Sequence, residues 1–479
     1  MSARDWEAVI GLEIHAQLLT ESKIFSSDCA RYGGGDNEYV HPVSLGMPGT
    51  LPVLNQKAVE YSTKIGLALG CEINSRSVFA RKNYFYPDLA KGYQISQFEE
   101  PLCRQGALEF YVEETLHKVL IERAHMEEDA GKSIHQGDAT LVNYNRAGVP
   151  LLEIVSGPDM RSGQEAAEYA RMMRRVLLYL EVCDGNLEEG SMRCDCNVSV
   201  RRKGDSKLGT KVELKNLNSF RFIEKAIEYE IQRQIDTIEA GESIIQETRL
   251  YDSAKNRTFS MRSKEEAHDY RYFPDPDLLP IELTDTWIEN LKKTLPELPL
   301  ARQQRFHRDY GIPLVDAANL TEEKDLADYF ELVAKDSGNP RAAGNWIMVE
   351  LVRELRESKC TVNEAPVLAK DLAKMIRMID DGQISGKMAK AVFQEMWKSG
   401  KDPEAVVKAK GMVQMSDESA ILDVICDVMA KNQAQVEEFR GGKEKVFGFF
   451  VGQVMKATKG QANPEVVNRL LQEKLKGSS

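Results

Sequence analysis

Alternation in the segment from Val9 to Leu18 constrains the fold more than any other feature of this chain. Ile10, Leu12, Ile14, Ala16 and Leu18 alternate with Val9, Gly11, Glu13, His15 and Gln17. Because successive side chains of a β-strand point to opposite faces, the segment predicts a strand with one face on a hydrophobic core. Glu13 and His15 then share the opposite face.

Three further segments place acidic side chains on or beside expected strands. They are the run Glu127, Glu128 and Asp129, the apolar stretch Leu151 to Val155 with Glu153 inside it, and the segment around Asp195. An ionised carboxylate in an apolar setting is costly unless it is paired or bound to a metal, so a hard cation such as Mg²⁺ would explain the group. For any single acid, a solvated or salt-bridged edge position is the alternative.

Composition narrows the class of protein. The chain has 479 residues, 42% of them hydrophobic and 29% charged, which predicts a globular protein of roughly two to four domains. No apolar run approaches the ~18 residues of a membrane span, and Met1 to Trp6 lacks signal or transit character. With 8 scattered cysteines, this predicts a cytoplasmic protein with no membrane partner. The net charge of −12 requires any nucleic acid to meet local basic patches.

The chain changes character at Pro296 and Pro299. Before these prolines, short strands alternate with helices, whereas after them strand signals nearly vanish. Thr321 is expected to cap a helix, with Glu322 and Glu323 in its first turn. Helices are expected over residues 164–180, 222–238, 320–333, 367–379, 387–397 and from Pro464 to near the C-terminus.

Gly131, Lys132 and Ser133 have the order that ends a phosphate-binding P-loop. A P-loop also needs a glycine five positions before Gly131, and Met126 stands there, so the match fails. Acids of this stretch could still hold a metal while Lys132 meets phosphate oxygens of ATP. A charged turn between strands is the alternative.

The segment from Met192 to Arg201 predicts a second strand with two distinct faces. Cys194 and Cys196 fall on the apolar face, which favours buried thiols over a zinc pair. Asp195 lies on the polar face with Asn197 and two arginines. Lys211 and Lys215 flank Glu213 in a similar alternation, which suits phosphate or metal binding or, more simply, a solvated face.

Three stretches combine cations with aromatic rings or glycines. They are Arg81 to Gln97, the cluster of Arg262, Lys264 and Asp269 to Phe273, and the C-terminal set Arg440, Lys443, Lys445, Lys456 and Lys459. Cations on phosphates and rings stacked on bases can hold single-stranded ends of nucleic acids, and a basic loop can contact an RNA backbone. Core aromatics and a solvated charged face are the alternatives.

Long motifs along the chain resemble the B subunit of the tRNA-dependent amidotransferases, the GatB family. They are VIGLEIHAQL from Val9, GMPGTLPVLN from Gly46, RKNYFYPDLAKGYQISQ from Arg81, HMEEDAGKS from His125, PLLEIVS from Pro150, EEGSMRCDCNVSVR from Glu188, ELKNLNSF from Glu213, DYRYFPDPDLLP from Asp269 and FGFFVGQVMKATKGQANP from Phe447. The resemblance implies an α+β fold. A cradle-shaped domain with a mixed or antiparallel sheet (residues 1–295) would be followed by an all-α helical domain (296–405) and a helical, tRNA-binding tail domain (406–479).

The resemblance also implies a reaction and a set of partners. ATP would phosphorylate the side-chain carboxylate of misacylated Glu-tRNA(Gln) or Asp-tRNA(Asn), and ammonia from an amidase A subunit, in a complex with a small C subunit, would displace the phosphate. The implied Mg²⁺ ligands are His15, Glu128 and Glu153, with Glu13 beside them, and Glu13, Glu128 and Lys82 are the implied catalytic residues. Lys82 would stand near the exit of the ammonia path. Lys132, Asp195, Lys211 and Lys215 are the expected contacts to the nucleotide.

One departure concerns zinc. Many family members carry two cysteine pairs that bind zinc, where this chain has Ser26 and Asp28, then His41 and Ser44. We therefore expect no zinc.

Two other functions compete with this interpretation. A non-catalytic adaptor that only positions tRNA would not need a hard-metal site. A free-standing ligase that joins ammonia to an amino acid would not need the basic tail.

Overall fold

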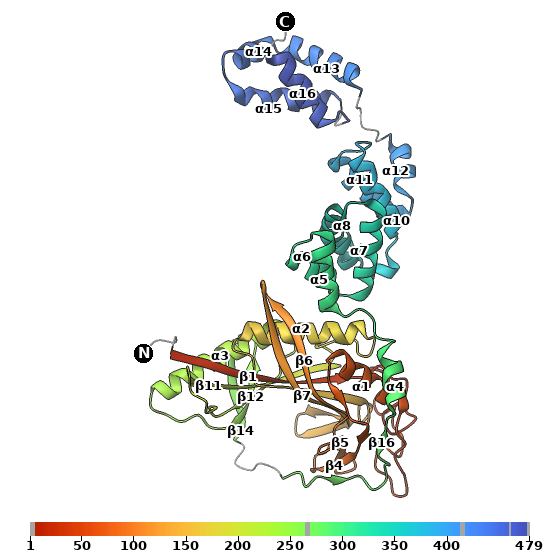
Figure 1. The fold of residues 1–479 in the computed structure, drawn as a ribbon, viewed down its shortest axis with the longest axis vertical. Helices are drawn as coiled ribbons and strands as arrows, with labels where there is room; N and C mark the ends of the chain where they lie inside the picture. The colour runs from red at the N-terminus through yellow and green to blue at the C-terminus, as the bar shows by residue number, and fades with distance from the viewer. Residues whose placement is uncertain (1–4, 264–268, 412–416, 459–460, 477–479) are drawn as a thin grey trace. The chain divides into compact units, whose positions relative to one another are not determined.

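The computed structural model describes residues 5–263, 269–411, 417–458 and 461–476. The chain forms two compact units, Met1–Arg302 and Gln303–Ser479. The first unit combines sheets and helices and the second is helical (Figure 1), which confirms the α+β fold class.

A nine-stranded, largely antiparallel sheet organises the first unit. Its strand order is β14 (Arg257–Ser263), β13 (Glu247–Asp252), β12 (Val212–Lys215), β11 (Met192–Arg202), β1 (Trp6–Gln17), β10 (Pro150–Ser156), β7 (Thr115–Glu128), β6 (Cys103–Val112) and β2 (Glu72–Ile73). Only β12 and β13 pair in parallel in this sheet. The strand predicted from Val9 to Leu18 is β1, which lies in the middle of the sheet.

Three smaller sheets complete the strands of this unit. They pair β15 (Phe273–Pro274), β4 (Phe79–Asn83) and β5 (Tyr93–Gln97); β16 (Ile281–Glu282) and β3 (Arg76–Ser77); and β8 (Lys132–Gln136) and β9 (Ala139–Asn143). The helices of the unit are α1 (Gln56–Ala68), α2 (Gly163–Tyr179), α3 (Phe220–Glu239) and α4 (Asp285–Lys292), and α5 (Pro299–Tyr310) begins in it.

The helices α2 and α3 cover one face of the large sheet (Figure 1). Ile10, Leu12 and Ile14 of β1 are at most 1% exposed and join the same core as Tyr169 and Met173 of α2. Each helix begins at a serine, because the hydroxyls of Ser162 and Ser219 accept hydrogen bonds from first-turn backbone N–H groups at 3.1 and 3.2 Å. The helices α2 and α3 therefore leave the opposite face of the sheet uncovered.

The second unit contains two separate hydrophobic cores, one within residues 306–407 and one within 421–475. Its helices are the rest of α5, then α6 (Leu314–Leu320), α7 (Lys324–Ser337), α8 (Pro340–Trp346), α9 (Val352–Ser358), α10 (Ala369–Asp380), α11 (Gly386–Ser399), α12 (Pro403–Lys410), α13 (Glu418–Lys431), α14 (Gln433–Arg440), α15 (Phe447–Ala457) and α16 (Pro464–Lys476). Ile347–Leu351 forms a π-helix, and Val362–Glu364 and Glu444–Val446 form 3₁₀ turns. In the described part of the chain, no helix is long and apolar enough to cross a membrane.

The expected cap at Thr321 is wrong. Thr321 ends α6, and its hydroxyl donates back to the carbonyl of Ala317 at 2.7 Å, so α7 begins three residues later at Lys324. The sequence pattern failed because a threonine can close one helix as readily as it opens the next. The expected helix from Pro464 is confirmed as α16.

Asp28 holds together the loop between β1 and α1, at the positions where family members are expected to carry zinc ligands. Its Oδ2 accepts hydrogen bonds from the backbone N–H of His41 at 2.6 Å and from the Ser44 hydroxyl at 3.0 Å. It also lies 3.6 Å from the Nζ of Lys23, whose side chain is fully buried. One carboxylate thus joins both ends of the loop.

We expect Asp28→Ala to lower the free energy of unfolding by about 3 kcal/mol, because it leaves a buried lysine without its counter-charge. Thermal unfolding measures the effect. Asp36→Ala in the same loop, whose exposed carboxylate accepts a hydrogen bond from the Asn143 side chain at 2.7 Å, should change stability by about 0.5 kcal/mol or less. Stoichiometric zinc in the wild-type protein, by metal analysis, would contradict the expectation of a metal-free loop.

Candidate active site

Neighbouring strands bring acids and histidines from distant segments to one face of the large sheet. β1 pairs antiparallel with both β10 and β11, and β10 also pairs with β7. The register sets His15 opposite Glu153, Glu153 opposite His125, and Glu13 opposite Asp195. Since directly opposite residues share a face, these side chains gather on the face away from α2 and α3. They line a cavity of about 720 Å³.

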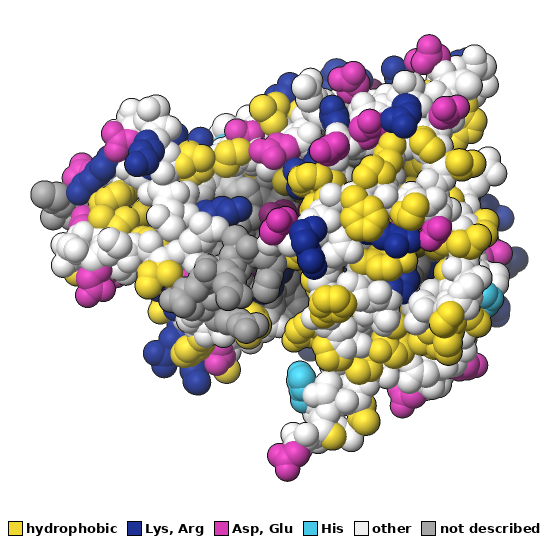
Figure 2. Space-filling model, turned by 90° about the horizontal axis from the view of Figure 1, so that it is seen from below, with side chains coloured by type: hydrophobic (Ala, Val, Ile, Leu, Met, Phe, Trp, Pro, Cys, Tyr) yellow, Lys and Arg dark blue, Asp and Glu magenta, His cyan; other side chains and the backbone are white. Residues whose placement is uncertain are grey.

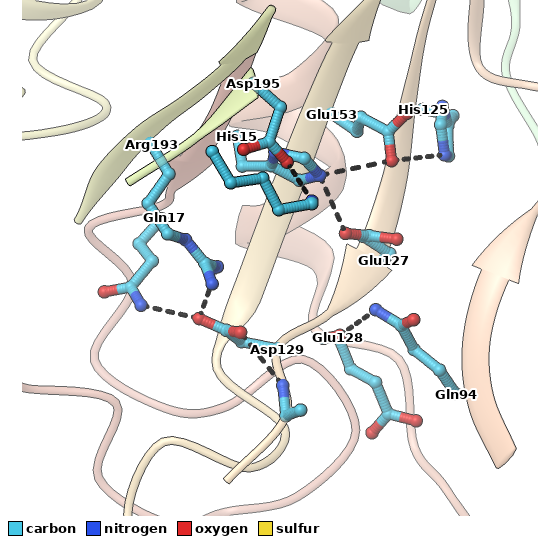
Figure 3. A network of polar contacts seen from close by, with 12 residues as sticks. His15, Gln17, Gln94, His125, Glu127, Glu128, Asp129, Glu153, Arg193 and Asp195 are labelled. Carbon is cyan, nitrogen blue, oxygen red and sulfur yellow. Dashed lines mark hydrogen bonds and ion pairs between the residues drawn. The ribbon is translucent and has the colours of Figure 1, made fainter. Parts of the chain in front are cut away.

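His15, Glu127 and Glu153 form the centre of this site (Figure 3). The Nε2 of His15 lies 3.3 Å from Oε2 of Glu153 and 3.8 Å from Oε1 of Glu127. The Nε2 of His125 lies 3.6 Å from the same Glu153 oxygen, and its Nδ1 has no hydrogen-bond partner among the described residues. We call His15, Glu127 and Glu153 the acid cluster.

Burial and mutual repulsion shift the pKa values of the acid cluster and its neighbours. Burial and the neighbouring Glu153 raise the pKa of Glu127 to about 7. Burial acts to raise the pKa of Glu153 as well, but the neighbouring histidines and the charge of Lys82 outweigh it and hold that pKa below its ordinary value. Burial lowers the pKa of His125 to about 4, so its ring is neutral near pH 7. Burial and Glu153 also raise the pKa of Glu13.

The donor set of the acid cluster fits a divalent cation. One ligand atom from each residue lies within 4.8 Å of the others. Within the described ranges, neither carboxylate has a lysine or arginine nitrogen within 4.0 Å, so the negative charge is unpaired apart from the histidines. Carboxylate oxygens suit Mg²⁺ or Mn²⁺, and an imidazole nitrogen can serve as a third ligand. Glu13 stands beside them, where its Oε1 accepts a hydrogen bond from Asn197 at 2.9 Å.

The structure separates Glu128 from the acid cluster and brings Glu127 in its place. Along β7, Glu127 shares the face of His125, whereas Glu128 shares the face of the fully buried Met126. The Glu128 carboxylate pairs with Lys91, whose Nζ is 2.6 Å from Oε2, and accepts the backbone N–H of Ile95 at 2.8 Å. Its polar partners therefore lie on the other side of the strand, and it is not a ligand in this geometry.

Lys132, which the sequence suggested as a nucleotide contact, lies away from the cavity. The chain leaves the large sheet after Asp129, and Lys132 opens the separate hairpin of β8 and β9 with an exposed side chain. Lys132 does not line the cavity. The residues that resemble a P-loop thus lie at the start of a hairpin strand.

The other expected cations do lie around the cavity. Lys82, Lys211 and Lys215 all line it. The Nζ of Lys215 is 2.6 Å from Oδ2 of Asp195 and 3.3 Å from Oε1 of Glu213, so Asp195 is neutralised where the acid cluster is not. Burial acts to lower the pKa of Lys82, but Glu127, Tyr272 and Glu153 outweigh it and raise the pKa above its ordinary value. Lys82 therefore carries a proton beside the acid cluster.

Sequence reasoning did not single out Arg123, His125 and Phe98, which line the cavity. Tyr84, Tyr270 and Tyr272 of the two aromatic stretches also line it, as does Arg193 from the polar face of β11, which donates to Asp129 at 2.8 Å. The two-residue period of β7 carried the signal for His125 and Glu127, because Ala124 and Met126 mark the core face. Lys264, expected near the second aromatic cluster, lies outside the described residues.

A comparison with protein families matches residues 8–289 to a model described as the GatB/GatE catalytic domain. The chain belongs to the GatB family. Residues 328–475 match the model of a second family domain, the GatB domain. The two matches confirm the resemblance inferred from the motifs.

Named relatives match the GatB chain over almost its whole length. A protein of Bdellovibrio bacteriovorus, named as the B subunit of an aspartyl/glutamyl-tRNA(Asn/Gln) amidotransferase, is 63% identical over 477 residues, covering 99% of this chain and 100% of the relative. Proteins of the same name from Thermodesulfovibrio yellowstonii and Geobacter sulfurreducens are 57% and 54% identical, covering 98% and 99% of this chain and 99% and 100% of the relatives.

Proposed function

We propose that this chain uses ATP to phosphorylate the side-chain carboxylate of Glu-tRNA(Gln) or Asp-tRNA(Asn), and that ammonia then displaces the phosphate. The names of the relatives supply the class of substrate. The observation that carries the proposal is the acid cluster, which lies in one cavity with Lys82, Lys211 and Lys215. Glu127 is buried and His15 and Glu153 are half-buried, and among the described residues neither carboxylate has a lysine or arginine nitrogen within 4.0 Å. Unpaired carboxylates beside cations suit a site for nucleotide phosphates and a divalent cation.

The chemistry explains why these groups are needed. A carboxylate is a poor acyl donor, because oxide is a very poor leaving group. Attack of the carboxylate oxygen on the γ-phosphorus of ATP releases ADP, and ammonia then attacks the acyl carbon and releases phosphate. A bound Mg²⁺ would offset negative charge on the phosphates.

The residues of the cavity have separate roles in this proposal. His15, Glu127 and Glu153 hold the cation, with Glu13 beside them. Lys211 and Lys215 meet the nucleotide phosphates, and Lys215 at the same time neutralises Asp195. Lys82, protonated beside Glu127 and Glu153, stands where it can admit ammonia and exclude water.

We further propose a separate role for each domain of the chain. Residues 1–295 would carry the reaction, 296–405 would form the helical domain, and 406–479 would bind tRNA. In the tail, Arg440 donates to the carbonyl of Leu475 at 3.2 Å and the Nζ of Lys443 lies 3.5 Å from Oε2 of Glu438, which leaves Lys445 and Lys456 as the better candidates for RNA contacts. Lys459 lies outside the described residues.

Nitrogen would come from an amidase A subunit that works with a small C subunit, because the sequence has no serine and lysine amidase signature. Figure 2 shows one face of the molecule, on which hydrophobic side chains are spread among lysines and arginines. The first unit exposes Leu279, Phe85 and Val53 by 87%, 86% and 74%. We place the complex in the cytoplasm, which the eight free cysteines support.

The proposal is tested by following ADP and amide together. The purified complex is given ATP, glutamine and Glu-tRNA(Gln), and we expect one ADP for each Gln-tRNA(Gln) formed. Replacing Glu-tRNA(Gln) by Gln-tRNA(Gln), which has no carboxylate to phosphorylate, should stop ADP formation. An adaptor would instead bind both tRNAs without ADP formation that depends on the carboxylate, and activity on free glutamate without tRNA would favour the free-standing ligase.

A further inference from the structure

One side of the cavity is aromatic. Tyr84, Phe98, Tyr270 and Tyr272, which we call the aromatic wall, line the same cavity as Glu127 and Glu153. Phe98 and Tyr272 are stacked, with ring centroids 4.2 Å apart and planes inclined by 2°. Tyr270 meets Tyr272 and Tyr84 edge-on, with centroids 6.1 and 5.9 Å apart. The four rings therefore form one continuous group.

The aromatic wall is accessible rather than part of the core. Phe98 is 53% exposed and Tyr270 36% exposed, and neither belongs to the hydrophobic cores. Large aromatic side chains usually bury most of their surface, since burial is the main source of their stabilisation. A ligand that covers the exposed stacked pair beside the charged site would therefore gain the stabilisation that comes from burying aromatic surface.

The distribution of charge indicates which part of a ligand suits the aromatic wall. Lys211, Lys215 and Arg193 line other parts of the cavity and suit phosphates. Glu127 and Glu153 would repel a phosphate placed beside them without a cation. Lys82 lies at the aromatic wall, with its Nζ 4.9 Å from the ring centroid of Tyr270. A neutral, planar base gains stacking there and meets no charge repulsion.

We propose that the aromatic wall binds the adenine ring of a substrate, with Phe98 as the main stacking surface. This inference rests on the proposed function, because that function supplies two substrates that carry adenine. They are ATP and the tRNA, whose 3′ end is an adenosine. The same stacking chemistry serves either source.

The test uses the whole complex and replaces the ring of Phe98. Phe98→Leu removes the stacking surface but keeps an apolar side chain, and Phe98→Tyr keeps the ring. We expect Phe98→Leu to raise one KM about tenfold with little change in kcat, and Phe98→Tyr to stay within about twofold of wild type. A rise in the KM for ATP assigns the adenine to the nucleotide, and a rise in the KM for Glu-tRNA(Gln) assigns it to the tRNA end. Phe259→Leu, an exposed phenylalanine outside the cavity, is the matched control.

Unchanged KM values for both substrates in Phe98→Leu would overturn the inference. An equal loss in Phe98→Tyr, or in the Phe259→Leu control, would overturn it too. Equilibrium binding of ATP and of an uncharged tRNA to the same variants gives a readout that does not depend on turnover. A wild-type complex that forms no ADP would refute the proposed function alone, because the binding measurements would still decide whether the aromatic wall holds adenine.

Discussion

Glu127→Gln should reduce ATP-dependent amidation about 10³-fold while glutamine hydrolysis by the partner amidase continues. The substitution keeps the size of the side chain but removes one of the two carboxylates of the acid cluster. Loss of a single electrostatic group that stabilises developing charge typically costs two to three orders of magnitude in rate, about 10²–10³. Amidation is measured as the rate of Gln-tRNA(Gln) formation, and hydrolysis as glutamate release from glutamine.

The thermal stability of Glu127→Gln is an internal control. Burial and Glu153 raise the pKa of Glu127 to about 7, so its ionised form is disfavoured in the folded protein. A neutral amide removes that repulsion, and we expect a melting temperature equal to or above that of wild type. Retained amidation in a folded variant would contradict the role of the acid cluster.

Glu128→Gln should have the opposite pattern, losing stability and keeping the chemistry. Its carboxylate pairs with Lys91, whose side chain is only 10% exposed, and accepts the N–H of Ile95. Removing one partner of such a buried pair leaves an uncompensated charge, and we expect a loss of about 3 kcal/mol in the free energy of unfolding. Thermal or denaturant unfolding measures it, and amidation assayed well below the melting temperature should stay within about threefold of wild type.

The matched control for Glu128→Gln is Glu109→Gln, on neighbouring β6. Glu109 forms an ion pair at 3.7 Å with Lys118, but both side chains are largely exposed, at 43% and 60%. Exposed pairs contribute about 0 to 1 kcal/mol, so this variant should unfold close to wild type. A Glu128→Gln protein that is stable yet inactive would show that Glu128, and not Glu127, acts in the reaction.

The contrast between the unpaired Glu127 and the paired Glu128 extends to the other acids of the site. Asp129 accepts hydrogen bonds from Gln17 at 2.7 Å and Arg193 at 2.8 Å, and Asp195 is paired with Lys215. Those carboxylates have partners and can support the surrounding structure. Among the described residues, the only basic groups with a nitrogen within 4.0 Å of the Glu127 and Glu153 carboxylates are histidines, and this difference supports the proposal that these two acids hold a cation.

Much of the site was predictable from side-chain periodicity. The alternation around Glu13 and His15 correctly predicted that they lie on one face, and the apolar stretch around Glu153 correctly predicted a strand. Lys82, Lys211 and Lys215 also reach the cavity as expected. The expected cap at Thr321 is wrong, and Glu128 and Lys132 lie away from the acid cluster. Each of the three lies at or next to the end of an element, where local sequence does not determine whether the chain continues in the same strand or helix.

The sequence by itself determined the family, the α+β class and the identity of the residue types at the site, because motifs and strand periodicity are local properties of the chain. The period of β7 separates the faces of Glu127 and Glu128, but only the tertiary structure decided that the face of Glu127 meets His15 and Glu153. That choice depends on the pairing of β7 with β10, between segments more than twenty residues apart, and on Lys91, which neutralises Glu128 on the other side of the strand. Long-range register and the position of a counter-charge are set by packing, and no local pattern contains them.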